Sequence, residues 1–141
     1  MDIAELLIFT VQNDGSDLHV SAGEQPYIRI HGEMRKVEIP KMETDDVHRM
    51  IYDILNDQQR KIFEEHFELD FSFSLGEHGR FRGNVFKQNR GDAAVFRVIP
   101  NRIPTFEELR LPKVFADFAA LEKGLVLITG PTGCGKSTTL A

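Results

Sequence analysis

The residues with the most specific chemistry form the segment Gly130–Ser137, which reads Gly-Pro-Thr-Gly-Cys-Gly-Lys-Ser. This segment matches the phosphate-binding pattern G-x-x-x-x-G-K-[ST] at every fixed position. In such a loop, successive backbone N–H groups turn toward one point and bind phosphate oxygens. The pattern predicts that Lys136 reaches the β- and γ-phosphates of a nucleotide and that the Ser137 hydroxyl binds Mg²⁺. The predicted nucleotide-contacting residues of the loop are Thr132, Gly133, Cys134, Gly135, Lys136, Ser137 and Thr138.

The segments on both sides of the loop support this interpretation. Leu125–Thr129 is apolar and partly β-branched, which predicts a buried parallel strand, and a helix is expected to begin after Ser137. The alternative is a glycine-rich turn with a chance lysine, and the complete pattern together with the preceding strand makes it much the weaker of the two. A loop of this kind does not by itself distinguish an ATPase from a kinase or a GTPase.

The chain ends at Ala141, four residues after Ser137. A complete nucleotide-hydrolysing domain also needs an acidic strand end for Mg²⁺ and a group that positions the attacking water. We therefore expect the catalytic acidic residues to lie beyond Ala141 and the 141 residues alone to be inactive. A non-catalytic interaction or oligomerisation module, with the loop as a remnant, is the alternative from another class.

Composition excludes several classes of protein. The formal net charge of −5 argues against general nucleic-acid binding, and no apolar run is long enough to cross a membrane. Acidic residues near Met1 argue against a secretion signal, and the single cysteine, Cys134, fits a reducing cytoplasm. The five histidines are scattered, with no cluster at metal-ligand spacing.

Apolar periodicity predicts an α+β domain with an antiparallel sheet over residues 1–99, a linker over 100–105 and the start of a parallel α/β nucleotide domain over 106–141. The two prolines of the linker exclude regular structure there. Helices are expected over 2–13, after an N-cap at Thr44, from Asp57, and from Pro112 to near Leu121. The predicted strands are 18–20, 27–31, 34–39, 69–75, 81–88 and 93–99, with turns at Gly32–Glu33 and Asn89–Asp92.

Basic residues concentrate between Arg80 and Arg102, where the local charge is +5 against −10 for the rest of the chain. Alternation along the strand places Arg80, Arg82 and Asn84 on one face. A row of arginines suits an anion held by paired hydrogen bonds, whereas the plain alternative is a solvated face. A third possibility is RNA binding through Phe81, Phe86 and Phe96. The chain lacks the aromatic motif and the positive net charge that are typical of RNA-binding sheets.

In order and spacing, five stretches of the chain resemble the retraction ATPases of bacterial type IV pili, the PilT type, within the type II/IV secretion motor ATPases. The stretches are Ser16–Gly23, Ile28–Gly32, Arg80–Phe86, Ala94–Pro100 and Ile128–Leu140. The resemblance covers essentially the whole chain. One departure is Gly83, where the family often has valine.

The resemblance implies a PAS-like N-terminal domain joined by a linker to a RecA-like ATPase domain, six subunits in a ring, and ATP with Mg²⁺ bound between the two domains. It implies a motor in the cytoplasm, at the inner face of the inner membrane, that engages the pilus machinery, drives pilus retraction and so supports twitching motility. It also implies that Arg82 and Arg97 contact nucleotide phosphates. An accessory paralogue of the retraction motor remains open as the alternative.

Overall fold

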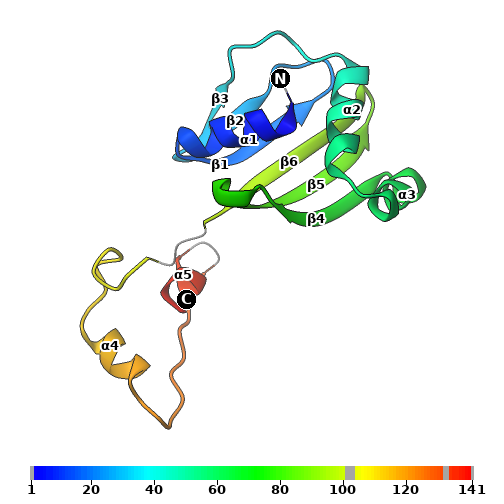
Figure 1. Ribbon diagram of the computed structural model, residues 1–141. Coiled ribbons are helices and arrows are strands. Elements are labelled where there is room, and N and C mark those ends of the chain that lie inside the picture. The colour runs from blue at the N-terminus through cyan, green and yellow to red at the C-terminus, as the bar shows by residue number, and fades with distance from the viewer. Residues whose placement is uncertain (1, 101–103, 132–133, 141) are drawn as a thin grey trace. The chain divides into compact units, whose positions relative to one another are not determined.

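The computed structural model describes residues 2–100, 104–131 and 134–140. The chain divides into two compact units, Met1–Pro100 and Asn101–Ala141 (Figure 1). The elements of the first unit are α1 (Ile3–Gln12), β1 (Gly15–Ser21), β2 (Tyr27–Ile30), β3 (Glu33–Lys36), α2 (Thr44–Ile54), α3 (Asp57–His66), β4 (Glu68–Ser74), the short 3₁₀ helix η1 (Gly76–His78), β5 (Arg80–Gln88) and β6 (Gly91–Ile99); those of the second are α4 (Val114–Ala119) and α5 (Lys136–Leu140).

The first unit is built on one antiparallel sheet with the strand order β3-β2-β1-β6-β5-β4. Two meanders, β1–β2–β3 and β4–β5–β6, meet where β1 pairs with β6. The α+β class with an antiparallel sheet is therefore confirmed. The strands of the second meander follow the predicted segments to within two residues at each end.

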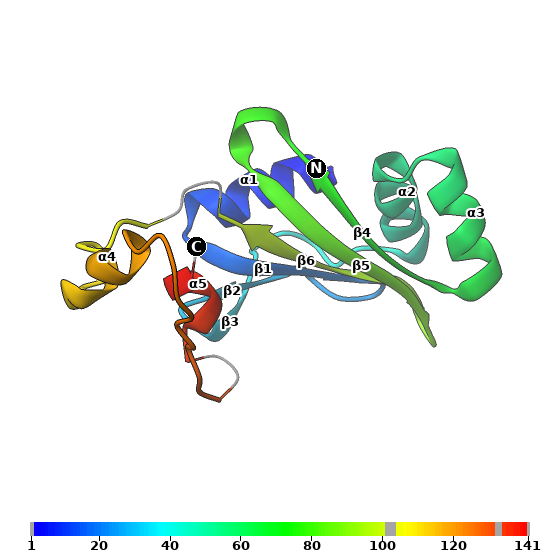
Figure 2. The same cartoon turned by 90° about the horizontal axis from the view of Figure 1, so that it is seen from below.

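One face of the sheet carries the hydrophobic core, because the helices α1 and α2 lie on the same side of it (Figure 2). Leu6 of α1 and Ile51 of α2 are fully buried in one cluster with Phe81, Phe96 and Leu18 of the strands. Burying one such side chain stabilises the fold by about 1.5–3 kcal/mol. Since side chains alternate along a strand, the residues between these apolar positions form a polar face on the other side of the sheet.

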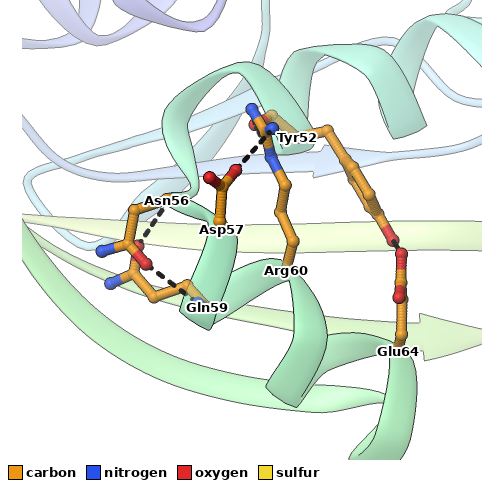
Figure 3. A network of polar contacts seen from close by, with 6 residues as sticks. All are labelled: Tyr52, Asn56, Asp57, Gln59, Arg60 and Glu64. Atoms are coloured by element: carbon orange, nitrogen blue, oxygen red, sulfur yellow. Dashed lines mark hydrogen bonds and ion pairs between the residues drawn. The ribbon is translucent and has the colours of Figure 1, made fainter.

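Polar contacts fix the start of α3 to the end of α2 (Figure 3). Asn56 and Gln59 form a reciprocal capping box, in which each side chain accepts a hydrogen bond from the other residue's backbone N–H. Arg60 donates from Nε and Nη2 to the Tyr52 carbonyl oxygen, over 3.1 and 2.8 Å. This oxygen lies in the last turn of α2 and also accepts from the Leu55 backbone N–H over 3.2 Å, so the arginine adds to the cap of the helix. The predicted helix start at Asp57 is confirmed.

Three predicted boundaries are wrong. The turn expected at Asn89–Asp92 comprises only Asn89 and Arg90, because Gln88 pairs with Gly91. The turn expected at Gly32–Glu33 is His31–Gly32, because Ile30 pairs with Glu33. Both turn residues have positive φ, 49° and 88°, as a type I′ hairpin turn requires. The N-cap of α2 is Glu43 instead of Thr44, whose hydroxyl donates to the Arg90 carbonyl oxygen over 3.1 Å and so ties α2 to the β5–β6 turn.

The second unit contains little regular structure in its described part. The predicted strand Leu125–Thr129 does not form, and Leu125 and Leu127 are 81% and 74% exposed. A strand requires a hydrogen-bonded neighbour, and the described residues of this unit supply none. The helix expected from Pro112 is α4, which begins at Val114. The predicted linker 100–105 lies partly outside the described residues and stays a prediction.

Candidate functional site

The glycine-rich loop takes a backbone path that depends on its glycines. Gly130 and Gly135 have φ values of 157° and 89°, a range that residues with side chains rarely adopt. A Cβ atom on Gly130 would lie only 2.7 Å from the Cys134 sulfur. Two of the predicted contact residues, Thr132 and Gly133, lie outside the described residues.

Lys136, the first residue of α5, folds back across this loop. Its ammonium group donates to the carbonyl oxygens of Gly130 and Pro131 over 2.9 and 2.7 Å. The Cys134 sulfur lies 3.8 Å from the same nitrogen and is a third, weaker partner. Among the described residues, no carboxylate accepts a hydrogen bond from this ammonium group. The loop therefore keeps a positive charge that fits a phosphate group.

The predicted Mg²⁺ ligand, Ser137, follows directly on α5 and is exposed, as is Thr138. The described residues hold no group of three or more His, Cys, Asp or Glu side chains placed for a metal ion. One hydroxyl oxygen suits Mg²⁺, which takes oxygen ligands and usually keeps several waters and substrate phosphates. Ser137 can thus supply one ligand, and the remaining ligands must come from the nucleotide, water or other residues.

The two arginines predicted to contact phosphates lie side by side on the polar face of the sheet in the first unit. Arg82 of β5 and Arg97 of β6 are directly opposite each other in the antiparallel register. Their side chains are 65% and 70% exposed. The same register continues the row through Asp17 of β1 to Arg29 of β2, so that four neighbouring strands each place one charged side chain in line.

Asp17 is the buried member of this row, with its side chain 8% exposed. It accepts hydrogen bonds from the Ser16 hydroxyl over 2.8 Å and from Arg97 Nε over 3.0 Å, and Arg29 Nε lies 3.4 Å away. Burial alone would raise the pKa of Asp17, but these hydrogen bonds and the charges of Arg97 and Arg29 outweigh it and lower the pKa. Asp17 therefore stays ionised and balances part of the positive charge.

A hollow of about 270 Å³ opens on the polar face beside the arginines. Arg82 contacts the exposed Asp70 at 3.6 Å, a separation at which a surface ion pair contributes little. The lining residues are Asp17, Asp70, Arg82, Asn84, Val95 and Arg97. An oxyanion of phosphate size fits the donor groups of this hollow, although the two carboxylates reduce its net charge.

Sequence reasoning missed Asp17 and Arg29 as parts of this face. The alternation in Ser16–Ser21 already separates the apolar Leu18 and Val20 from the polar Asp17 and His19. His19 has a lowered pKa, because burial disfavours its charged form, and its buried Nε2 atom has no hydrogen-bond partner in the part of the chain that the structure describes. Pattern alone gave no reason to connect this strand with the arginines far along the chain.

The RNA-binding alternative is wrong in the form considered. Phe81 and Phe96 are fully buried in the core and cannot stack on bases. Phe86 is half-buried, and it alone of the three keeps any access to solvent.

Comparison with known proteins shows the family. The model of the family described as type II/IV secretion system protein matches residues 2–141. The chain belongs to this family. It is 55% identical over its whole length to the type IV pilus retraction ATPase PilT of Pseudomonas aeruginosa and 37% identical to the type IV pilus ATPase PilU of the same organism. It covers 41% and 37% of these relatives, so the chain spans about two fifths of their length.

The fold of the chain agrees with this membership. A crystal structure of the pilus retraction motor PilT with bound ADP matches with a TM-score of 0.87 and 37% identity, over 99% of this chain and 41% of that one. The match supports nucleotide binding in the family, since the solved relative holds ADP. Among the described residues of the present chain, none of the helices has the length and apolar character that crossing a bilayer requires.

Proposed function

We propose that these 141 residues are the N-terminal part of an ATPase motor subunit that retracts type IV pili. The observation that carries the proposal is the complete phosphate-loop pattern with Lys136 folded across it, in a chain 55% identical to a pilus retraction ATPase. The higher identity to PilT than to PilU favours the retraction motor over its accessory paralogue.

In this proposal residues 1–99 form a PAS-like domain, 100–105 a linker and 106–141 the start of a RecA-like ATPase domain. The apolar composition of Leu125–Thr129 supports such a start, since central parallel strands have this composition. The assembly is a homo-hexamer that works in the cytoplasm, at the inner face of the inner membrane, together with the pilus machinery.

The loop binds the polyphosphate of ATP through its backbone N–H groups. Lys136 exchanges its contacts with the Gly130 and Pro131 carbonyls for phosphate oxygens, and Ser137 holds Mg²⁺. When bound, Mg²⁺ neutralises charge on the β- and γ-phosphates. Arg82 and Arg97 add positive charge where negative charge develops on the transferred phosphoryl group.

The test measures ATP turnover by a full-length ATPase that carries these residues. Lys136→Ala abolishes turnover, whereas Lys123→Ala, an exposed lysine in the same unit, leaves it unchanged. Full turnover in the Lys136 variant would contradict the motor mechanism and favour the interaction module. Weaker competition by GTP than by ATP at the same site argues against a GTPase.

A matched pair of variants tests the arginine. Arg82→Ala lowers turnover by roughly tenfold or more, by analogy with the loss of one donor to a developing negative charge. Arg80→Ala removes the same charge two residues earlier on the same strand face and leaves turnover near the parent value. Equal effects of the two variants on turnover would contradict the phosphate contact and favour the interpretation of Arg82 as a solvated surface residue.

A further inference from the structure

The contact between Asp17 and Arg97 has a specific geometry. Arg97 donates to Asp17 through Nε, over 3.0 Å, and the rest of its side chain is exposed. The two terminal amino groups of Arg97 have no hydrogen-bond partner among the described residues. The carboxylate thus contacts the side of the guanidinium group and leaves its end free.

Asp17 is anchored independently of Arg97. Its second oxygen accepts from the Ser16 hydroxyl over 2.8 Å and lies 3.4 Å from Arg29 Nε. Arg29 in turn donates from Nη1 to the Gly32 carbonyl oxygen over 3.2 Å. A carboxylate held from several sides provides a fixed point for a long side chain that otherwise samples many rotamers.

The position of the free guanidinium end is set by the strands. Arg97 lies between Asp17 and Arg82 in the cross-strand register, and all three residues line the hollow. Arg97 is paired with Asp17, and Arg82 is weakly paired with Asp70. Together the two guanidinium groups present several donors to a single oxyanion. Unpaired, the two like charges would separate, because facing cations on adjacent strands repel each other.

We propose that Asp17 is a positioning residue, which orders Arg97 so that its terminal amino groups contact the nucleotide phosphate. This inference rests on the phosphate role proposed for Arg97 above. A side chain that is already ordered loses less conformational entropy on binding than a free one. Asp17 therefore acts on catalysis only through Arg97.

The experiment is a double-mutant cycle on kcat/KM for ATP in a full-length ATPase that carries these residues. Asp17→Asn keeps the shape of the side chain and removes its charge, and it lowers kcat/KM by roughly two- to tenfold, the penalty for ordering one long side chain anew. In the Arg97→Ala background the same substitution has no further effect. An undiminished Asp17→Asn effect in that background overturns the positioning role alone. If Arg97→Ala itself leaves kcat/KM unchanged, both the positioning role and the phosphate role of Arg97 are refuted.

Two further variants separate positioning from a loss of folding. Asp92→Asn is the matched control, because Asp92 is equally buried, at 5% exposure, and contacts His48. It leaves kcat/KM unchanged even where it lowers the melting temperature as Asp17→Asn does. Arg97→Lys keeps the positive charge and leaves Asp17 in place. Because a lysine has a single ammonium group, which pairs with Asp17, no second donor group remains for the phosphate, so kcat/KM falls as far as in Arg97→Ala. A lysine variant within twofold of the parent would show that side-on positioning is unnecessary and overturn the proposal.

Discussion

Gly83 lies in the middle of β5, and its α-carbon faces the core between two phenylalanine rings. A Cβ atom at this position would lie 2.9 Å from Cε1 and Cζ of Phe71 and 3.0 Å from Cδ1 of Phe96. The two rings meet edge to face, with their centroids 6.5 Å apart. The φ angle of Gly83 is outside the left-handed region, so the glycine is needed for space and not for its backbone conformation.

Gly83→Ala should therefore destabilise the first unit. Overpacking a core by one methyl group costs about 1–3 kcal/mol, and the better strand preference of alanine returns about 0.5–1 kcal/mol. The expected net loss is about 1–2 kcal/mol, which lowers the melting temperature of a domain of about 100 residues by roughly 4–15 °C. Thermal and urea unfolding of the chain, followed by circular dichroism, measures both quantities.

Phe71→Leu provides the control, since leucine lacks the distal ring carbons that approach position 83. In that background Gly83→Ala should destabilise the unit much less than in the parent chain. Equal losses in both backgrounds, or a Gly83→Ala variant as stable as the parent, would refute the argument that the Phe71 ring fills the space of the missing side chain.

Three further outcomes test other parts of the first unit. His31→Asn should raise its stability by ~0.5 kcal/mol in urea unfolding, because asparagine adopts the positive φ of the hairpin turn more readily; a lower midpoint would contradict the turn type. Arg60→Ala should lower its stability by about 1 kcal/mol through the lost bonds to Tyr52, while the exposed pair partner Asp57 can be replaced by asparagine without measurable effect. Asp17 has a lowered pKa in the folded state, so the stability that its ionised form contributes is complete above the ordinary aspartate pKa of about 4 and is lost as the pH falls through the lower, folded value. Asp17→Asn should therefore flatten the pH dependence of the unfolding free energy in this range. An unchanged slope would contradict the network around Asp17.

Most of the first unit could be predicted because its signals are local. The alternation in Leu69–Leu75 places one face in the core wherever the strand lies in the sheet. The turn at His31–Gly32 was misplaced because glycine signals positive φ, while histidine at the preceding position gives no such signal. Composition alone predicts the strand Leu125–Thr129, because an apolar run favours burial but does not show whether a neighbouring strand is present.

The pairing of Arg82 with Arg97 depends on a detail that sequence patterns specify poorly. The predicted turn Asn89–Asp92 would pair Gln88 with Ala93 and therefore Arg82 with Ile99. In the structure Gln88 pairs with Gly91, and this shift of two residues brings the two arginines opposite each other. Hairpin register follows from the length of the loop, so an error in the loop displaces every cross-strand pair.

The basic segment shows why charge along the sequence does not define a binding site. Lys87 lies over the Phe67 ring and Arg90 pairs with Glu24, so these two cations are already engaged elsewhere in the unit. What distinguishes Arg97 is a carboxylate 80 residues earlier in the chain, which becomes its neighbour only because β1 pairs with β6. A buried counter-ion usually signals a neutralised charge, but contact through Nε leaves the other donors of the guanidinium group free. The Asp17–Arg97 pair can therefore stabilise the fold and also position the arginine for binding an anion. The contact through Nε, instead of through the terminal amino groups, distinguishes this arrangement from simple charge neutralisation.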